Sequence, residues 1–235
     1  MTVPSNGARP ARTVHNADAI AWLKAQPPLA GCSFITSLPD VSELPPLTLE
    51  EWKRWFVDAA ALVLSRCPPE GVAIFYQTDI KPAGEWVDKG YLVFKAAEQQ
   101  GMTLLFHKIV CRKPVGTVTF GRPAYSHMLA FSSGVRADLS KATADVLPGT
   151  GEMTWTKAMG VEACVAACRF VQANTTTRTI VDPFCGRGTA LAVANALGLD
   201  AIGVELSRKR ARQARNLRVE VGGAGALVQS RGELD

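Results

Sequence analysis

Short apolar runs alternate with longer amphipathic segments along most of the chain. Runs of four to eight apolar residues between turn residues are typical of buried parallel strands, whereas apolar positions at a period of 3.6 predict helices. We expect strands at 13–15, 31–36, 71–76, 104–110, 126–131, 179–181 and 201–204. We expect helices at 18–25, 49–66, 86–99, 189–197 and 207–219, and one within 153–171 that begins after Lys157. The alternation predicts an α/β fold with a mostly parallel seven-stranded sheet.

Turn and capping residues fix several of these boundaries. Thr48 and Glu51 have the spacing of a capping box, so a helix should begin at Leu49. Asn16 is a plausible cap for the first helix, and Gly198 ends the helix that begins near Thr189.

The stretch 179–206 carries the most specific signal. A β-branched strand leads into the glycine turn DPFCGRGT at 182–189, then a helix, then a strand that ends in Glu205. This is the nucleotide-binding half of a doubly wound sheet, in which an acid after the second strand suits the hydroxyls of a ribose. The third glycine of the dinucleotide fingerprint is missing after Gly188, which argues against a dinucleotide.

The string DPFCGRGT, followed by GVEL at 203–206, resembles the motif pair of S-adenosylmethionine (SAM) methyltransferases, especially those that methylate amino groups of bases in DNA and RNA. The resemblance implies a Rossmann-like SAM-methyltransferase fold and SAM as the cofactor. It places the following residues at the cofactor: Asp182, Pro183, Phe184, Gly186, Gly188, Thr189, Glu205 and Leu206.

The segment 16–40 resembles the opening of the permuted amino-methyltransferases, where an acid, a short helix and a strand precede a tetrapeptide Asp/Asn/Ser-Pro-Pro-aromatic. The resemblance puts Asp18 at the adenine and Thr36 beside the cofactor. Ser37-Leu38-Pro39-Asp40 falls on the tetrapeptide, and the catalytic candidates are Ser37, Pro39 and Asp40. Leu38 replaces a proline, and Asp40 replaces the aromatic residue.

Asp40 has two interpretations. An aspartate cannot stack on a base, but it can accept a proton as a general base. Alternatively, Asp40 only caps the turn before Val41.

The segment 111–133 again resembles the family, where a Trp-x-Lys-Pro loop leads to an arginine turn and a His-Glu strand. Lys113, Arg122 and His127 are therefore candidates for substrate binding in an antiparallel hairpin at the sheet edge. Its basic residues either meet phosphates or protect a solvated edge. Lys157, before a helix, is a candidate for the carboxylate end of SAM or a plain surface lysine.

The catalytic-loop candidate precedes the SAM loop, an order that resembles a circularly permuted class. We expect one methyltransferase domain at 13–221, with a catalytic-loop half at 13–135 and a SAM-binding half at 152–221. Residues 1–12 should be flexible, and 222–235 should form a tail in which 226–229 can add a strand. The linker 136–151 is too short for a separate domain that reads DNA sequence, which favours an already exposed target such as an RNA loop.

Composition changes this picture little. The net charge of +5 permits a polyanionic partner without proving one. We expect no membrane span, because no apolar run approaches about 20 residues. The N-terminus lacks a signal-peptide core, and six cysteines make no disulfide framework in a chain this long, so we expect an intracellular, cytoplasmic or nuclear protein.

Three hypotheses follow. The chain is a nucleic-acid methyltransferase, with RNA ahead of DNA; or a methyltransferase of small molecules or proteins; or a non-catalytic subunit that kept the fold. A homodimer or a partner protein is compatible with each of them.

Overall fold

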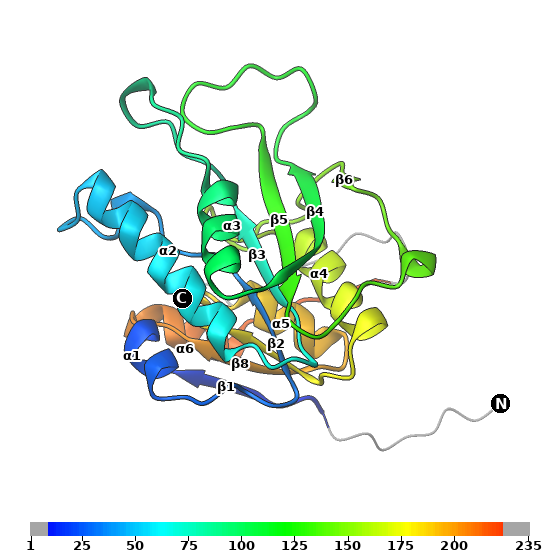
Figure 1. Ribbon diagram of the computed structural model, residues 1–235. Coiled ribbons are helices and arrows are strands. Elements are labelled where there is room, and N and C mark those ends of the chain that lie inside the picture. The colour runs from blue at the N-terminus through cyan, green and yellow to red at the C-terminus, as the bar shows by residue number, and fades with distance from the viewer. Residues whose placement is uncertain (1–8, 223–235) are drawn as a thin grey trace.

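A twisted sheet of eight strands runs through the molecule in the order β1-β8-β7-β2-β3-β5-β4-β6 (Figure 1). The computed structural model describes residues 9–222. The strands are β1 Arg12–His15, β2 Cys32–Thr36, β3 Ala73–Gln77, β4 Thr103–Cys111, β5 Tyr125–Ser132, β6 Val146–Leu147, β7 Thr179–Asp182 and β8 Asp200–Val204. The α-helices are α1 Ala19–Lys24, α2 Leu49–Arg66, α3 Lys89–Gln99, α4 Val161–Asn174, α5 Thr189–Ala196 and α6 Arg208–Asn216. Short 3₁₀ turns lie at η1 Val41–Glu43, η2 Pro82–Gly84 and η3 Leu139–Lys141.

Strand direction confirms a mostly parallel sheet with an antiparallel part, but the β4–β5 hairpin lies one strand in from the edge, which β6 forms. Within residues 9–222, only β5 runs against its neighbours, β3 and β4, and the other five strand pairs are parallel. The count of seven strands is corrected to eight, because the segment expected to be a linker contributes β6. In β6, Val146 and Leu147 pair with Ile109 and Val110.

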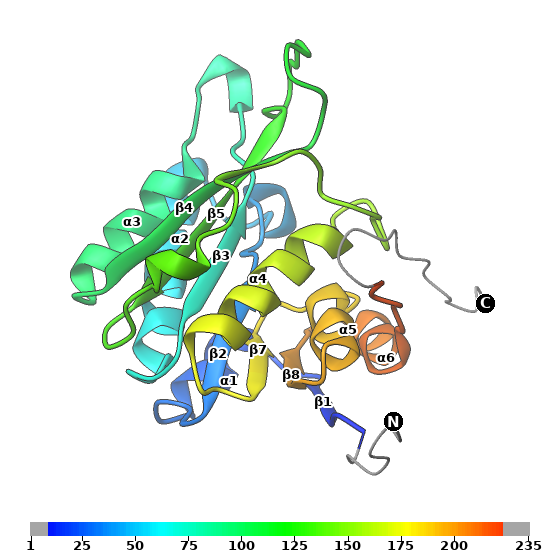
Figure 2. The ribbon, with the colours of Figure 1, turned by 90° about the vertical axis from the view of Figure 1, so that its right-hand side faces the viewer.

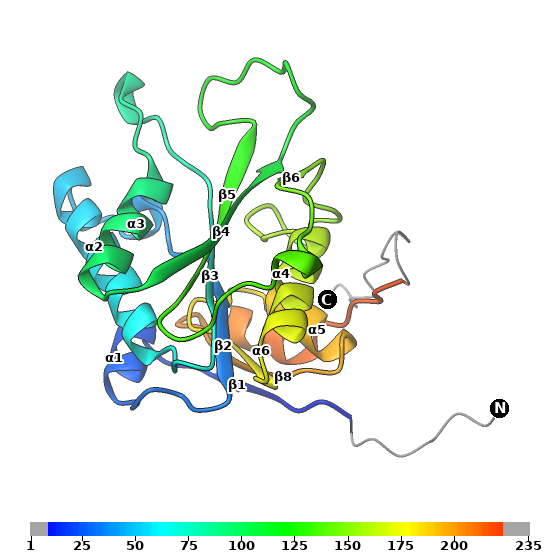
Figure 3. The same ribbon diagram turned by 45° about the vertical axis from the view of Figure 1, so that its right-hand side comes forward.

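Two layers of helices enclose the sheet, with α1, α2 and α3 on one face and α4, α5 and α6 on the other (Figures 2 and 3). The first face is packed with aromatic side chains, including Trp52 and Phe56 of α2. The second face carries small residues on α4 and α5, including the buried Cys164 and Cys168. The two cysteines are therefore core residues, as their i,i+4 spacing predicted.

Helix starts differ from the sequence prediction where a polar side chain caps a later turn. Asp18, not Asn16, caps α1, because its carboxylate accepts a hydrogen bond from the Ala21 amide at 2.8 Å. Asp88 caps α3 through the Tyr91 amide at 2.8 Å. The helix expected after Lys157 begins at Val161, after Gly160 with φ +86°. The capping box of Thr48 and Glu51 is confirmed.

The adjacency of β8, β7 and β2 positions the site. These parallel strands end at the same edge of the sheet, so the loops after them meet there. Those loops carry Glu205, the glycine turn and Ser37. No helix among residues 9–222 has the length and apolar character needed to cross a bilayer. The expected strand at 226–229 lies outside the described residues.

Candidate functional site

A cavity of about 250 Å³ lies where the loops after β2, β7 and β8 converge. Ser37 and Pro39 line one wall of this first cavity, and the glycine turn lines another. The cofactor candidates that line it are Asp18, Lys157, Asp182, Pro183, Phe184, Gly186, Thr189, Glu205 and Leu206. Thr36 and Gly188 lie outside the lining. Segments nearly 150 residues apart along the chain thus share one cavity.

Asp182 is the buried acid of the first cavity. Its Oδ1 accepts hydrogen bonds from the Thr36 hydroxyl at 2.7 Å and from the Phe184 amide at 3.1 Å. Burial raises the pKa of Asp182 to about 7, although these two hydrogen bonds oppose the shift. Thr36 therefore acts through Asp182, which it orients.

Glu205 follows β8 and is also buried in the cavity wall. Its Oε1 accepts from the Ser207 amide at 2.7 Å and pairs with Arg210 Nε at 3.1 Å. Oε2 has no hydrogen-bond donor among residues 9–222, so it remains able to accept one from a ligand hydroxyl. Asp18 lines the same cavity from the cap of α1.

The glycine turn needs its glycines for two reasons. Gly186 and Gly188 have φ of +55° and +84°, which disfavour any side chain. A Cβ on Gly188 would meet Cβ of Ala214 in α6 at 2.8 Å, so this glycine allows close helix packing. A Cβ on Gly186 would meet the Trp155 ring at 3.0 Å.

The loop 152–160 packs against the glycine turn, and the sequence prediction named only Lys157 in it. Trp155 lines the first cavity, and the Arg187 guanidinium lies 5.2 Å from the centre of its ring. Thr154 and Thr189 share a hydroxyl hydrogen bond of 2.5 Å, which ties the loop to the start of α5. The sequence signal that could have indicated this contact is Trp155 itself, a large aromatic residue outside any strand or helix.

The donor set of the first cavity fits SAM. SAM carries an ammonium and a sulfonium group, which favour the acid Asp182, and a ribose diol, which suits the free Oε2 of Glu205. Trp155 and Phe184 supply flat apolar surface, and Gly186, which has no side chain, lets a ligand approach the backbone. When bound, SAM would supply an electrophilic methyl group.

A second cavity of about 320 Å³ adjoins the first. Six residues line both cavities: Ser37, Leu38, Glu43, Lys157, Ala158 and Met159. The Lys157 ammonium lies 3.0 Å from a Glu43 carboxylate oxygen, so an ion pair spans this shared wall. Four basic side chains line the second cavity, Lys89, Arg112, Arg122 and Lys157, against two acidic ones, Asp40 and Glu43.

Asp40 is an ion-paired residue of the second cavity. Its two carboxylate oxygens bond to the buried Lys89 ammonium and to the Arg122 guanidinium. Burial alone would raise the pKa of Asp40, but the two cations outweigh it and lower the pKa below its ordinary value. Asp40 also precedes η1, and its amide donates to Glu43 Oε2 at 3.1 Å. This arrangement favours an anchoring role over that of a general base, which needs a raised pKa and a free oxygen.

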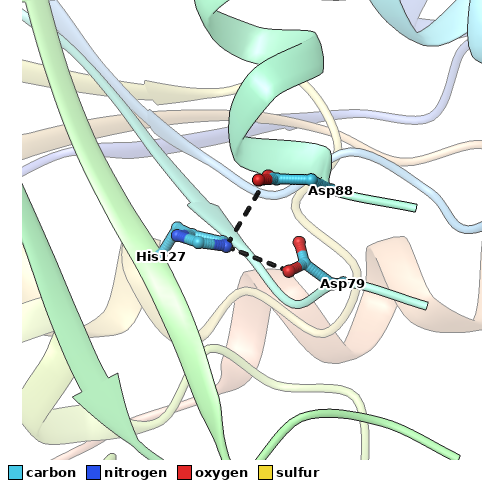
Figure 4. A group of neighbouring side chains, drawn as sticks. All are labelled: Asp79, Asp88 and His127. Carbon is cyan, nitrogen blue, oxygen red and sulfur yellow. Dashed lines mark hydrogen bonds and ion pairs between the residues drawn. The ribbon is translucent and has the colours of Figure 1, made fainter. Parts of the chain in front are cut away.

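His127 does not line the second cavity. Its Nε2 is 3.1 Å from Asp79 Oδ2 and 3.8 Å from Asp88 Oδ1 (Figure 4), and its Nδ1 is 3.0 Å from His107. The ligand atoms of Asp79, Asp88 and His127 lie within 4.8 Å of one another, the spacing of a metal site.

All three residues already have structural partners. Asp79 accepts hydrogen bonds from the Trp86 indole at 3.0 Å and from the Lys89 amide at 2.9 Å, and Asp88 caps α3. The group therefore fixes the start of α3, and with it Lys89. The remaining substrate candidates differ in position, since Arg122 lines the second cavity whereas Lys113 is exposed on the β4–β5 loop.

Comparison with known proteins agrees with this geometry. Residues 168–216 match a family model described as DNA methylase (N6_N4_Mtase). No curated protein matches the chain in sequence.

Several solved structures share the fold. A protein assigned as a DNA modification methylase from Thermus thermophilus, complexed with SAM, has a TM-score of 0.65 at 19% identity, over 87% of this chain and 91% of that one. PvuII DNA methyltransferase (cytosine-N4-specific) has a TM-score of 0.64 at 16% identity, over 88% of each chain. The M1.HpyAVI–SAM complex has a TM-score of 0.57 at 14% identity, over 87% of this chain and 97% of that one. The matched segment contains the glycine turn and Glu205, and the chain shares its fold with these methyltransferases, so it is similar to DNA methylases in this segment and in its fold.

Proposed function

We propose that this protein is a SAM-dependent methyltransferase, and that it transfers the methyl group of SAM to an exocyclic amino group of a base in DNA. The observation that carries the proposal is the wall shared by the two cavities, with Ser37 and Leu38 between the SAM side and the acceptor side. A base in the second cavity would present its amino group to this wall. The DNA methylase family model and the DNA methyltransferases with the same fold support this substrate class.

Ser37 is the residue we assign to the acceptor amine. The amine lone pair is delocalised into the ring, so catalysis depends on orienting the amine against the sulfonium more than on removing a proton. Ser37 lines both cavities, and its hydroxyl can accept an amine hydrogen. Pro39 holds the turn, and its carbonyl accepts from the buried Trp52 indole at 3.2 Å.

We propose DNA as the substrate, whereas the sequence favoured RNA because the segment 136–151 is short. The argument for RNA assumed that a DNA methyltransferase needs a separate domain to read the DNA sequence. The family model and the solved DNA methyltransferases favour DNA. The circular permutation remains part of the proposal. It is supported by the chain order, in which β2 and Ser37 precede β7 and the glycine turn while the two strands lie side by side.

The test is transfer of tritium from labelled SAM to unmethylated genomic DNA, total RNA and a protein extract, followed by nucleoside analysis. We expect label in N6-methyladenine or N4-methylcytosine of DNA. Ser37→Ala should reduce transfer and leave SAM binding unchanged, whereas the exposed Ser140→Ala serves as the matched control. Label confined to protein, to small molecules or to RNA would overturn the proposal.

A further inference from the structure

The loop between β4 and β5, residues 112–124, extends beyond the edge of the sheet (Figures 1 and 3). Its neck is closed, because the amides of Arg112 and Lys113 both donate to the Ala124 carbonyl, at 2.6 and 3.1 Å. A turn inside the loop is fixed by the Thr117 amide, which donates to the Pro114 carbonyl at 3.1 Å. The loop therefore projects from a defined base.

The loop exposes its large apolar side chains to solvent. Val115 is 93% exposed, Val118 is 76% exposed and Phe120 is 89% exposed. No aromatic ring contact involves Phe120 among the described residues. Exposed apolar residues that gather on one surface are characteristic of a binding surface, because water contact with them is unfavourable.

The charge of the loop favours a polyanionic partner. Arg112, Lys113 and Arg122 are basic, and residues 112–124 contain no acid. Basic side chains beside an exposed aromatic ring are the combination that binds nucleic acid, since the cations meet phosphates and the ring stacks on a base. A membrane surface rich in anionic lipid would need the same two features.

The neck of the loop distinguishes these partners. Arg112 and Arg122 both line the second cavity, and Arg122 pairs there with Asp40. A chain bound along the loop therefore leads directly to the place where an acceptor base would sit. Binding to a lipid surface would not require the loop to lie next to the second cavity.

We propose that the β4–β5 loop holds the DNA strand beside the target nucleotide, with Phe120 stacked on a neighbouring base and Lys113 on a backbone phosphate. This inference rests on the proposed function and names the residues that grip its substrate.

Binding measurements separate this proposal from the activity. A fluorescein-labelled single-stranded oligonucleotide of mixed sequence, and its duplex, are titrated with the full chain and S-adenosylhomocysteine. Phe120→Ala should weaken binding to the single strand about 5- to 100-fold, and Phe120→Trp should restore it. Leu139→Ala, at a side chain 85% exposed on another loop, is the control and should change nothing. Lys113→Gln should reduce the dependence of log Kd on log salt by about one.

Two further readouts decide the outcome. The added tryptophan of Phe120→Trp should be quenched when DNA binds, relative to the wild type. If DNA is methylated but Phe120→Ala binds and reacts like the wild type, the inference fails and the proposed function stands. If Phe120→Ala instead loses binding to phosphatidylglycerol vesicles while DNA binding is unchanged, the loop is a lipid anchor and the inference is overturned. Failure of the wild type to methylate DNA would count against the proposed function itself.

Discussion

The ammonium group of Lys89 is buried against the carboxylate of Asp40, and both side chains line the second cavity. Arg122, from the β4–β5 loop, forms a second ion pair with Asp40. The residue that replaces the expected aromatic side chain thus joins three segments: the turn after β2, the start of α3 and the β4–β5 hairpin. We infer that its charge organises the acceptor side.

Removing one partner of this pair should be costly. Asp40→Leu leaves Lys89 buried without a counter-ion, so the free energy of unfolding should fall by about 3–5 kcal/mol, measured by urea titration. The double variant Asp40→Leu/Lys89→Met removes both charges and should be more stable than Asp40→Leu alone. SAM binding should persist in the folded double variant, because neither residue lines the first cavity. A double variant as unstable as the sum of the single variants would contradict the pairing.

The raised pKa of Asp182 makes stability depend on pH. The folded pKa is about 7 and the ordinary value is 3.8, so between these values the folded state binds more protons than the unfolded state. The contribution of Asp182 is therefore most favourable at low pH, and it declines by about 1.4 kcal/mol per pH unit as the pH rises toward the folded pKa.

Asp182→Asn isolates this effect, because the amide keeps an oxygen for Thr36 and Phe184 but does not ionise. The stability of the variant relative to the wild type should rise from about pH 5 to the folded pKa and level off above it. Denaturant unfolding across that range measures the difference. A constant difference would show that Asp182 ionises normally.

Glu205→Gln should weaken SAM binding by about ten- to a hundredfold, because a charge-assisted hydrogen bond to the ribose is lost. The glutamine can still accept from the Ser207 amide, so the local fold should remain. Calorimetry with SAM gives the affinity, and the exposed Glu98→Gln is the matched control. Unchanged affinity in Glu205→Gln would remove this residue from the SAM site.

Gly186→Ala and Gly198→Ala form a matched pair. Both positions have positive φ, +55° and +81°, so each alanine should cost about 1 kcal/mol of stability. Only at Gly186 would the new Cβ meet Trp155, whereas nothing lies within 4 Å of the Cβ at Gly198. Gly186→Ala should therefore also weaken SAM binding. Equal SAM affinity in the two variants would mean that Trp155 does not shape the site.

The sequence was sufficient wherever function depends on local chain order. The glycine turn follows a strand and precedes a helix, so the positions of Asp182 and Glu205 were predictable from the two flanking strands. The capping box at Thr48 is equally local. These features need no knowledge of distant contacts.

Features that depend on distant partners were not predictable in the same way. The lysine that neutralises Asp40 is 49 residues away along the chain, and Arg122 is 82 residues away. The segment 154–157 was placed before a helix and only Lys157 was singled out in it, so the contact between Trp155 and the distant Gly186 was not predicted. His127 matched a family position, yet its neighbours Asp79 and His107 come from other segments, and it does not line the second cavity.

The wall common to both cavities has a thermodynamic consequence. Ser37, Leu38 and the Glu43–Lys157 ion pair face both chambers, so a ligand that moves them on one side alters the other. Coupling of this kind is reciprocal. If DNA in the second cavity changes the affinity for SAM by some factor, SAM changes the affinity for DNA by the same factor. Loss of the methyl group from the sulfur would therefore change the affinity for both ligands.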